Sequence, residues 1–98
     1  MNRGEIWTLA DGHNVLIISL SGLEETYGAV LVIVLHDSGK YPDTAMSVVI
    51  GDPIPCTAVA VNLTQLRVNR FGGAKLLGPV APAAMARVDQ ALRAVQDL

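Results

Sequence analysis

The sequence has little cysteine, and it has no long apolar run. Cys56 is the only cysteine in 98 residues, so an internal disulfide or a site with several cysteine ligands cannot form. A lone cysteine is typical of a reducing compartment. The longest apolar run spans residues 29–35, whereas a membrane-spanning helix needs about 20 residues. No apolar segment follows the first five residues, as it would in a signal peptide. We therefore expect a cytoplasmic protein with no membrane partner.

Charged residues are few as well, and their balance does not favour binding to nucleic acid. Seven Lys and Arg against nine Asp and Glu give a net charge of −2, so a strongly basic surface is excluded and any basic site must be local. Charged residues make up 16% of the chain and apolar residues 51%, a balance that excludes intrinsic disorder. So few charges predict an exposed apolar patch, which a second copy would cover in a homodimer.

What is present indicates one domain, residues 1–98, built mainly of strands. Stretches typical of strands, alternating in residues 5–9 and mostly apolar elsewhere, occupy residues 5–9, 15–18, 29–35, 45–50, 57–61 and 63–68, the last two forming either two strands or one bent strand. Residues 21–28 have room for one helical turn. The spacing of the apolar residues changes to that of a helix near the C-terminus, where Met85, Val88, Leu92 and Val95 form one stripe after Pro82. The pattern predicts a mainly β (α+β) fold, a small antiparallel barrel of five to six strands with a C-terminal helix.

Three segments resemble a known family in their order along the chain. Residues 3–7, RGEIW, match the opening of the MazF/PemK-type toxins of bacterial type II toxin–antitoxin systems. Residues 65–67, QLR, are similar to the family's Q-I-R step, and residues 77–92 are similar to its ending, G-x-L-S-x-x-x-M-x-x-V-D-x-A-L. The likeness spans nearly the whole chain.

The resemblance implies a fold, an activity and partners. The family has an SH3-like barrel with a C-terminal helix and works as a homodimer, and most of its members cut single-stranded RNA at short sequences without a metal or cofactor. A cognate antitoxin protein blocks its groove. These features are what we expect of this chain if the likeness extends to function.

The sequence departs from the family at the two positions that carry catalysis. His13 stands where the family's second strand opens with arginine, and His36 stands at the threonine that ends its third strand. The first turn, residues 10–12, is much shorter than the family's first loop. Thr64 replaces the usual acidic residue before the Q-I-R step.

These two histidines suggest a specific chemistry. RNA cleavage of this kind needs a base for the 2′-OH proton, an acid for the leaving 5′-oxygen and positive charge at the phosphate. Because histidine titrates near neutral pH, one ring can be neutral while the other is charged. We therefore interpret His13 and His36 as a catalytic acid–base pair, with Arg67 or Lys40 at the phosphate. Both histidines would equally suit ordinary half-exposed strand ends.

Further residues are candidates for RNA binding. Amide and hydroxyl side chains can read the edges of unstacked bases, and arginines can follow the phosphate backbone. The candidates are Asn14, Asn62, Thr64, Gln65 and Arg70. A solvated strand end explains each of them too. Trp7 in an alternating strand is better read as a core residue than as a base-stacking one, and Cys56 as a small buried side chain.

A second class of function stays open at this stage. Because both catalytic positions differ from the family and the net charge is acidic, the chain could be a non-catalytic dimeric binding module, either an inert relative or a gyrase-directed toxin like CcdB. The gyrase version is disfavoured because a tryptophan near the C-terminus matters in CcdB, whereas this chain ends Gln96-Asp97-Leu98.

Overall fold

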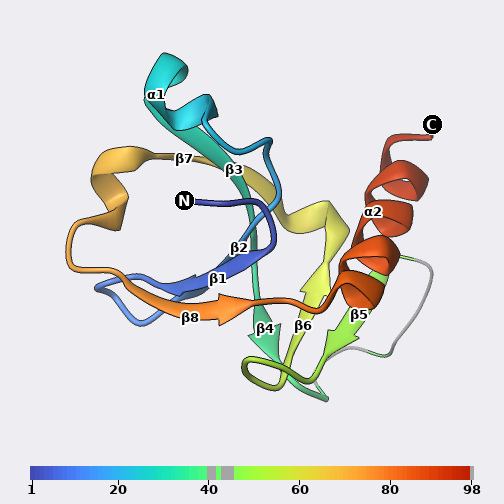
Figure 1. The fold of residues 1–98 in the computed structure, drawn as a ribbon. Helices are drawn as coiled ribbons and strands as arrows, with labels where there is room; N and C mark the ends of the chain where they lie inside the picture. The colour runs from blue at the N-terminus through green and yellow to red at the C-terminus, as the bar shows by residue number, and fades with distance from the viewer. Residues whose placement is uncertain (40–41, 43–45, 98) are drawn as a thin grey trace.

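The hairpin that opens the chain belongs to a curved antiparallel sheet of five strands. The computed structural model describes residues 1–39, 42 and 46–97. Within them the first sheet has the order β7–β3–β2–β1–β8, and its members are β1 (Glu5–Thr8), β2 (Asn14–Ile17), β3 (Ala29–Val34), β7 (Leu63–Arg67) and β8 (Lys75–Pro79). Figure 1 shows β7 and β8 as the two edges of this sheet, joined through the 3₁₀ helix η2 (Val68–Phe71).

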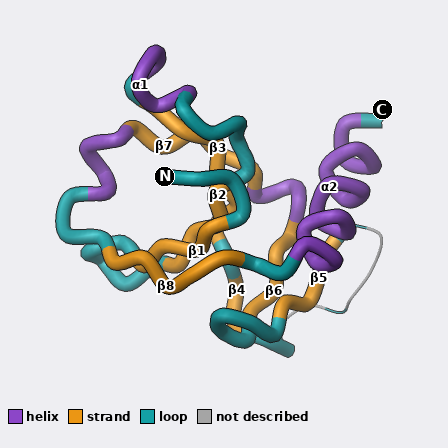
Figure 2. The backbone as a smooth tube through the Cα atoms, in the orientation of Figure 1, coloured by secondary structure: helices purple, strands orange, loops and turns teal. Residues whose placement is uncertain are grey.

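A second sheet continues directly from the first. The strand expected over residues 29–35 ends at Val34, and the chain passes through Leu35 into the short strand β4 (His36–Asp37). This strand pairs with β6 (Cys56–Val59), which also pairs with β5 (Ser47–Ile50). Figure 2 shows β4, β6 and β5 side by side below the first sheet. Cys56 is buried here as expected, and burial raises the pKa of its thiol to about 11.

The C-terminal helix closes one side of the molecule. Helix α2 (Pro82–Gln96) begins at the proline, as the sequence predicts, and its N-cap Ala81 makes no side-chain cap. It lies against β5 and the 3₁₀ helix η1 (Ala60–Asn62) (Figure 1). The predicted stripe is confirmed: Met85 and Val88 are buried, and Leu92 and Val95 pack against the same core. None of the helices within the described residues has the length and apolar character needed to cross a membrane.

Both faces of the central strands are buried, which explains why β2 and β3 read as continuous apolar runs. One face contributes Leu16 and Ile33 to a core beneath α2, which we call the helix-side core. The other face contributes Val15 and Val32 to a separate cluster, the loop-side core. Side chains that alternate along a strand point to opposite faces, so each strand supplies both cores.

The loop-side core is covered by aromatic residues. Trp7 packs against it, and its ring meets that of Phe71 edge to face with centroids 6.1 Å apart. The interpretation of Trp7 as a core residue is confirmed. The short helix α1 (Leu23–Tyr27) forms within the segment expected to hold one helical turn.

Strand β8 was not expected from the sequence. It pairs with β1, but the register shifts so that Ile6 faces Gly78 while Trp7 faces Leu76. Leu77 is therefore an extra residue on β8, as in a β-bulge. Glycine and proline inside or at the end of a strand weaken its sequence signal, and β8 ends in both. The total of eight strands in the described residues, against five to six expected, comes from this strand and from the break at Leu35.

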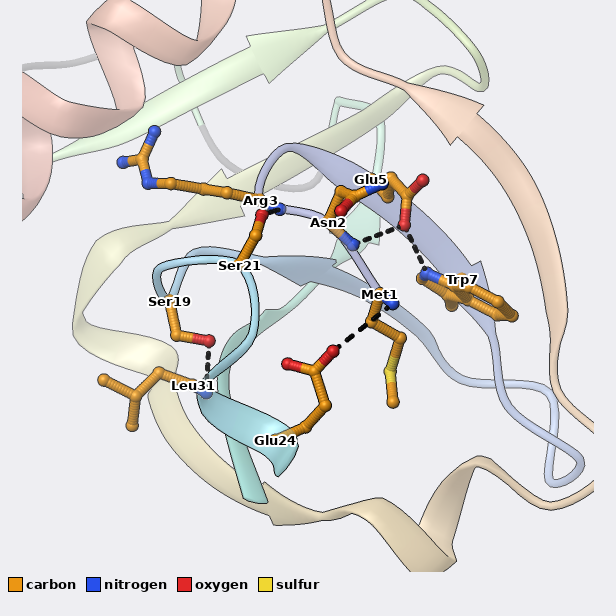
Figure 3. Close-up of polar contacts among 9 residues, drawn as sticks. All are labelled: Met1, Asn2, Arg3, Glu5, Trp7, Ser19, Ser21, Glu24 and Leu31. Atoms are coloured by element: carbon orange, nitrogen blue, oxygen red, sulfur yellow. Dashed lines mark hydrogen bonds and ion pairs between the residues drawn. The ribbon is translucent and has the colours of Figure 1, made fainter. Parts of the chain in front are cut away.

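Polar contacts fix the N-terminal segment beside β1 (Figure 3). Glu5 accepts hydrogen bonds from the backbone N–H of Asn2 at 2.7 Å and from the indole of Trp7 at 3.3 Å. The Met1 amine lies 3.6 Å from the carboxylate of Glu24 on α1.

Arg3 connects the first sheet to the C-terminal helix. Its side chain donates a hydrogen bond to the carbonyl of Ile18 at 3.0 Å, just past the end of β2. The same guanidinium forms an ion pair with Asp89 on α2. The start of the RGEIW segment is therefore bound to the part of the tail that carries the V-D step.

Candidate nucleic-acid interface

The two histidines lie at the same end of the β2–β3 ladder. Val15 pairs with Val34 in this ladder, and beyond it the Leu35 N–H donates to the Asn14 carbonyl at 2.9 Å. The next residues along the two strands are His13 and His36. The backbone therefore brings both positions to the same end of the ladder, where His36 already belongs to β4 of the second sheet.

The tight turn before β2 holds His13. The His13 carbonyl accepts from the Leu9 N–H at 2.8 Å, and Gly12 at the turn has φ of 93°, which favours glycine. The His13 backbone N–H donates to Oδ1 of Asp11 at 3.0 Å, and its ring atom Nδ1 lies 3.0 Å from the same oxygen. The imidazole is 66% exposed, so its other nitrogen is open to a ligand.

A cation completes this cluster. Nη2 of Arg70, at the end of η2, lies 3.9 Å from Oδ2 of Asp11. Hydrogen bonds from the His13 backbone and ring, together with the Arg70 charge, hold the pKa of Asp11 below its ordinary value. The carboxylate is thus ionised at neutral pH, and it lies between two groups that can carry positive charge.

These three residues border a cavity of about 200 Å³. Its apolar lining comes from Leu9, Val15, Val34 and Leu66 of the loop-side core. A cavity with an apolar lining and a few polar groups at one side is the usual form of a small ligand site.

His36 has a different partner. Its Nε2 lies 2.6 Å from the side-chain nitrogen of Asn62, the last residue of η1. An amide NH₂ only donates, so in this arrangement Nε2 accepts and a neutral ring carries its proton on Nδ1. A half-turn of the Asn62 amide would present its oxygen instead, and Nε2 could then carry a proton. The rings of His13 and His36 therefore have separate sets of contacts.

The residues expected to bind RNA divide between the two faces of the sheet. Thr64 pairs with Val32 and Leu66 with Val30, so Thr64 shares the face that holds the cavity beside His13. Thr64 is exposed there.

Gln65 lies on the other face. It pairs with Leu31 and lines a second, smaller cavity of about 150 Å³ together with Tyr27. Asn14 also turns away from His13, because alternate side chains on a strand point to opposite faces, and its Oδ1 accepts from the Thr8 hydroxyl at 2.6 Å.

Of the candidate phosphate-binding cations, Arg70 is the one found beside a histidine. Arg67 is exposed at the far end of β7, where it pairs with Ala29. Lys40 lies outside the described residues. The described residues hold no group of three or more His, Cys, Asp or Glu side chains arranged to bind a metal ion.

Sequence reasoning missed Asp11, which it treated only as part of a turn. The signal was present, because an aspartate two residues before another residue commonly accepts that residue's backbone N–H. The residue in that position here is the histidine already singled out. The pairing of Asn62 with His36 gave no local signal, since 26 residues separate the two.

The sequence matches no family model, and no curated protein matches it. Solved structures do match over essentially the whole chain. One is an endoribonuclease from a mycobacterial species in complex with its cognate antitoxin: TM-score 0.86, 23% identity, 100% of this chain and 96% of that chain. Another is a MazE–MazF complex from Deinococcus radiodurans: TM-score 0.84, 16% identity, 100% of this chain and 96% of that chain. The chain has the MazF fold.

A third match extends this likeness. The toxin MazF-mt6 of Mycobacterium tuberculosis has a TM-score of 0.75 at 19% identity, with 98% of each chain covered. The predicted fold class, mainly β with a C-terminal helix, and the predicted resemblance to MazF are confirmed at the level of the fold. His13 and His36 occupy the same end of two central strands of this MazF fold.

Proposed function

We propose that this chain is an endoribonuclease toxin of a type II toxin–antitoxin system, which cleaves single-stranded RNA without a metal or cofactor. The observation that carries the proposal is that His13 and His36 follow the same end of the β2–β3 ladder, where His13 and Arg70 border one cavity. The MazF fold supports it, because the MazF toxin and the mycobacterial endoribonuclease named above share that fold.

The chemistry uses the two imidazoles as base and acid. A neutral imidazole removes the proton from the ribose 2′-OH, and the 2′-oxygen forms a bond to phosphorus. The bond from phosphorus to the 5′-oxygen breaks, and an imidazolium gives its proton to that oxygen. A cyclic 2′,3′-phosphate and a free 5′-OH result. The guanidinium of Arg70 stabilises the charge that develops on the phosphate oxygens.

Partners and location belong to the same proposal. A type II toxin acts in the cytoplasm and is held inactive by a cognate antitoxin protein, as the mycobacterial endoribonuclease is found in complex with its own. A homodimer is supported by large apolar side chains left exposed in this chain, among them Leu20 at 70% and Tyr27 at 71%.

The test is cleavage of a mixed-sequence single-stranded RNA by the purified protein, with and without EDTA. We expect cleavage that EDTA does not change, and a loss of at least about 100-fold in His13→Ala and in His36→Ala, since a positioned acid or base contributes roughly 10²–10⁴-fold. Gln90→Ala, on the exposed side of α2, is the matched control and should cut like the wild type.

Two results would go against the proposal. If both histidine variants cleave RNA as fast as the wild type, His13 and His36 are not the catalytic acid and base. An intact RNA with the wild type, combined with growth arrest on expression, would favour the non-catalytic binding module instead.

A further inference from the structure

The carboxylate of Asp11 serves two neighbours at once. Its Oδ1 accepts from the backbone N–H and lies 3.0 Å from Nδ1 of His13, and its Oδ2 faces Arg70 at 3.9 Å. These are the charged and titratable groups that border the cavity. No role in catalysis or binding was assigned to Asp11 from the sequence.

The contact at Nδ1 sets which nitrogen of His13 holds the proton. An ionised carboxylate is only an acceptor, and the lowered pKa of Asp11 keeps it ionised at neutral pH. Nδ1 must therefore be the protonated nitrogen, and the lone pair of the neutral ring lies on Nε2. Because the ring is 66% exposed, this lone pair is accessible from solvent.

We propose that Asp11 is a positioning residue that makes His13 the general base of the cleavage reaction, an inference that rests on the proposed function. Nε2 of His13 takes the proton of the ribose 2′-OH while the 2′-oxygen attacks phosphorus. The departing 5′-oxygen takes a proton from His36 in its imidazolium form, in which the Asn62 amide is turned so that its oxygen faces Nε2. His13 ends the step as an imidazolium, which the Asp11 carboxylate stabilises through the Nδ1 proton.

Asp11 also has a purely structural role, and the experiment must separate this role from the effect of Asp11 on the His13 ring. The same Oδ1 accepts the His13 backbone N–H and so helps to fix the turn. Asp11→Asn keeps an acceptor oxygen for both the turn and the ring but removes the charge. Asp11→Ala removes the acceptor altogether.

The first measurement is the ¹⁵N spectrum of the His13 ring at a pH where it is neutral. We expect the proton on Nδ1 in the wild type and in Asp11→Asn, and on Nε2 in Asp11→Ala. A wild-type ring with its proton on Nε2 would overturn the inference, whatever the activity of the protein.

The second measurement is a double-mutant cycle with RNA cleavage as the readout. Asp11→Ala should lower kcat by about 10- to 100-fold, less than the roughly 10²–10⁴-fold that a base itself contributes, and should change KM by less than about twofold. Asp11→Asn should retain more activity than Asp11→Ala. In a His13→Ala background, Asp11→Ala should have a much smaller effect, because only its contacts with the turn backbone and with Arg70 are then left to lose.

Glu25→Ala removes the same charge from an exposed position on α1 and is the control; it should leave kcat unchanged. A full effect of Asp11→Ala in the His13→Ala background would mean that Asp11 acts through the turn or through Arg70 and not through the imidazole, and would overturn the inference. A wild type that leaves RNA intact overturns the proposed function as well. A wild type that cuts RNA, with Asp11→Ala cutting equally well, overturns this inference alone.

Discussion

At the scale of single residues, Asp11 shows how a turn residue acquires a chemical environment. The sequence places it in a tight turn, and the turn alone brings its carboxylate to the backbone N–H of the second residue along. That much follows from local rules. The approach of Arg70, 59 positions later in the chain, depends on how η2 returns to the hairpin, and no local pattern encodes it. The pairing of His36 with Asn62 is hidden from the sequence for the same reason.

Asp11 also makes stability depend on pH. A carboxyl group whose pKa is lower in the folded state than the ordinary value of 3.8 stabilises the fold above that pH. This contribution is lost as the pH falls through the folded-state value. We expect the wild type to be more stable than Asp11→Asn at pH 6, and the difference to shrink at pH 3. Urea unfolding at the two pH values measures it, and a difference that does not change with pH would contradict the assignment.

At the scale of elements, the sequence is most informative where the apolar residues keep one regular spacing along a whole segment. The stripe of Met85, Val88, Leu92 and Val95 predicts α2, because residues three and four apart share a helix face. The apolar run of residues 29–35 predicts a strand, but it gives no sign that this strand ends at Val34 or that the two polar residues after Leu35 form the separate strand β4. β8 was missed because Gly78 and Pro79 are typical of turns, and only pairing with β1 makes them part of a strand.

The helix stripe gives a prediction for stability. Val88 is fully buried in the helix-side core, where the shortened side chain of Val88→Ala would leave a cavity. We expect a loss of about 2 kcal/mol in the free energy of unfolding, at the lower end of the range for large-to-small core substitutions. Urea unfolding followed by circular dichroism checks it. Gln90→Ala on the same helix is exposed and should be within about 0.5 kcal/mol of the wild type.

At the scale of the whole molecule, composition indicated the class of fold but not the layout of its site. A chain with few charges and many apolar residues must bury both faces of its central strands, and two cores do flank β2 and β3. Residue type alone does not distinguish the candidate RNA-binding residues. The register of β7 separates them, placing Thr64 with the histidine cavity and Gln65 on the opposite face. Register depends on pairing between distant segments, so it could not be derived from residue type.

The exposed apolar residues predict association of whole chains. We expect sedimentation equilibrium at micromolar concentration to give about twice the 10.3 kDa mass of one chain. A species that stays at 10.3 kDa across that range would show that the exposed Leu20 and Tyr27 are not covered by a second copy.

The passage of the chain through Leu35 has a mechanical consequence. His13 is anchored to the five-stranded sheet, whereas His36 belongs to the ladder that β4 forms with β6. A change in the angle between the two sheets would thus alter the spacing of the two rings, since Leu35 is the residue that joins β3 to β4. A nucleotide that binds both imidazoles would restrict the movement of one sheet relative to the other. Hydrogen–deuterium exchange at the backbone amides of β4 and β6 would then slow, although the nucleotide does not contact these amides.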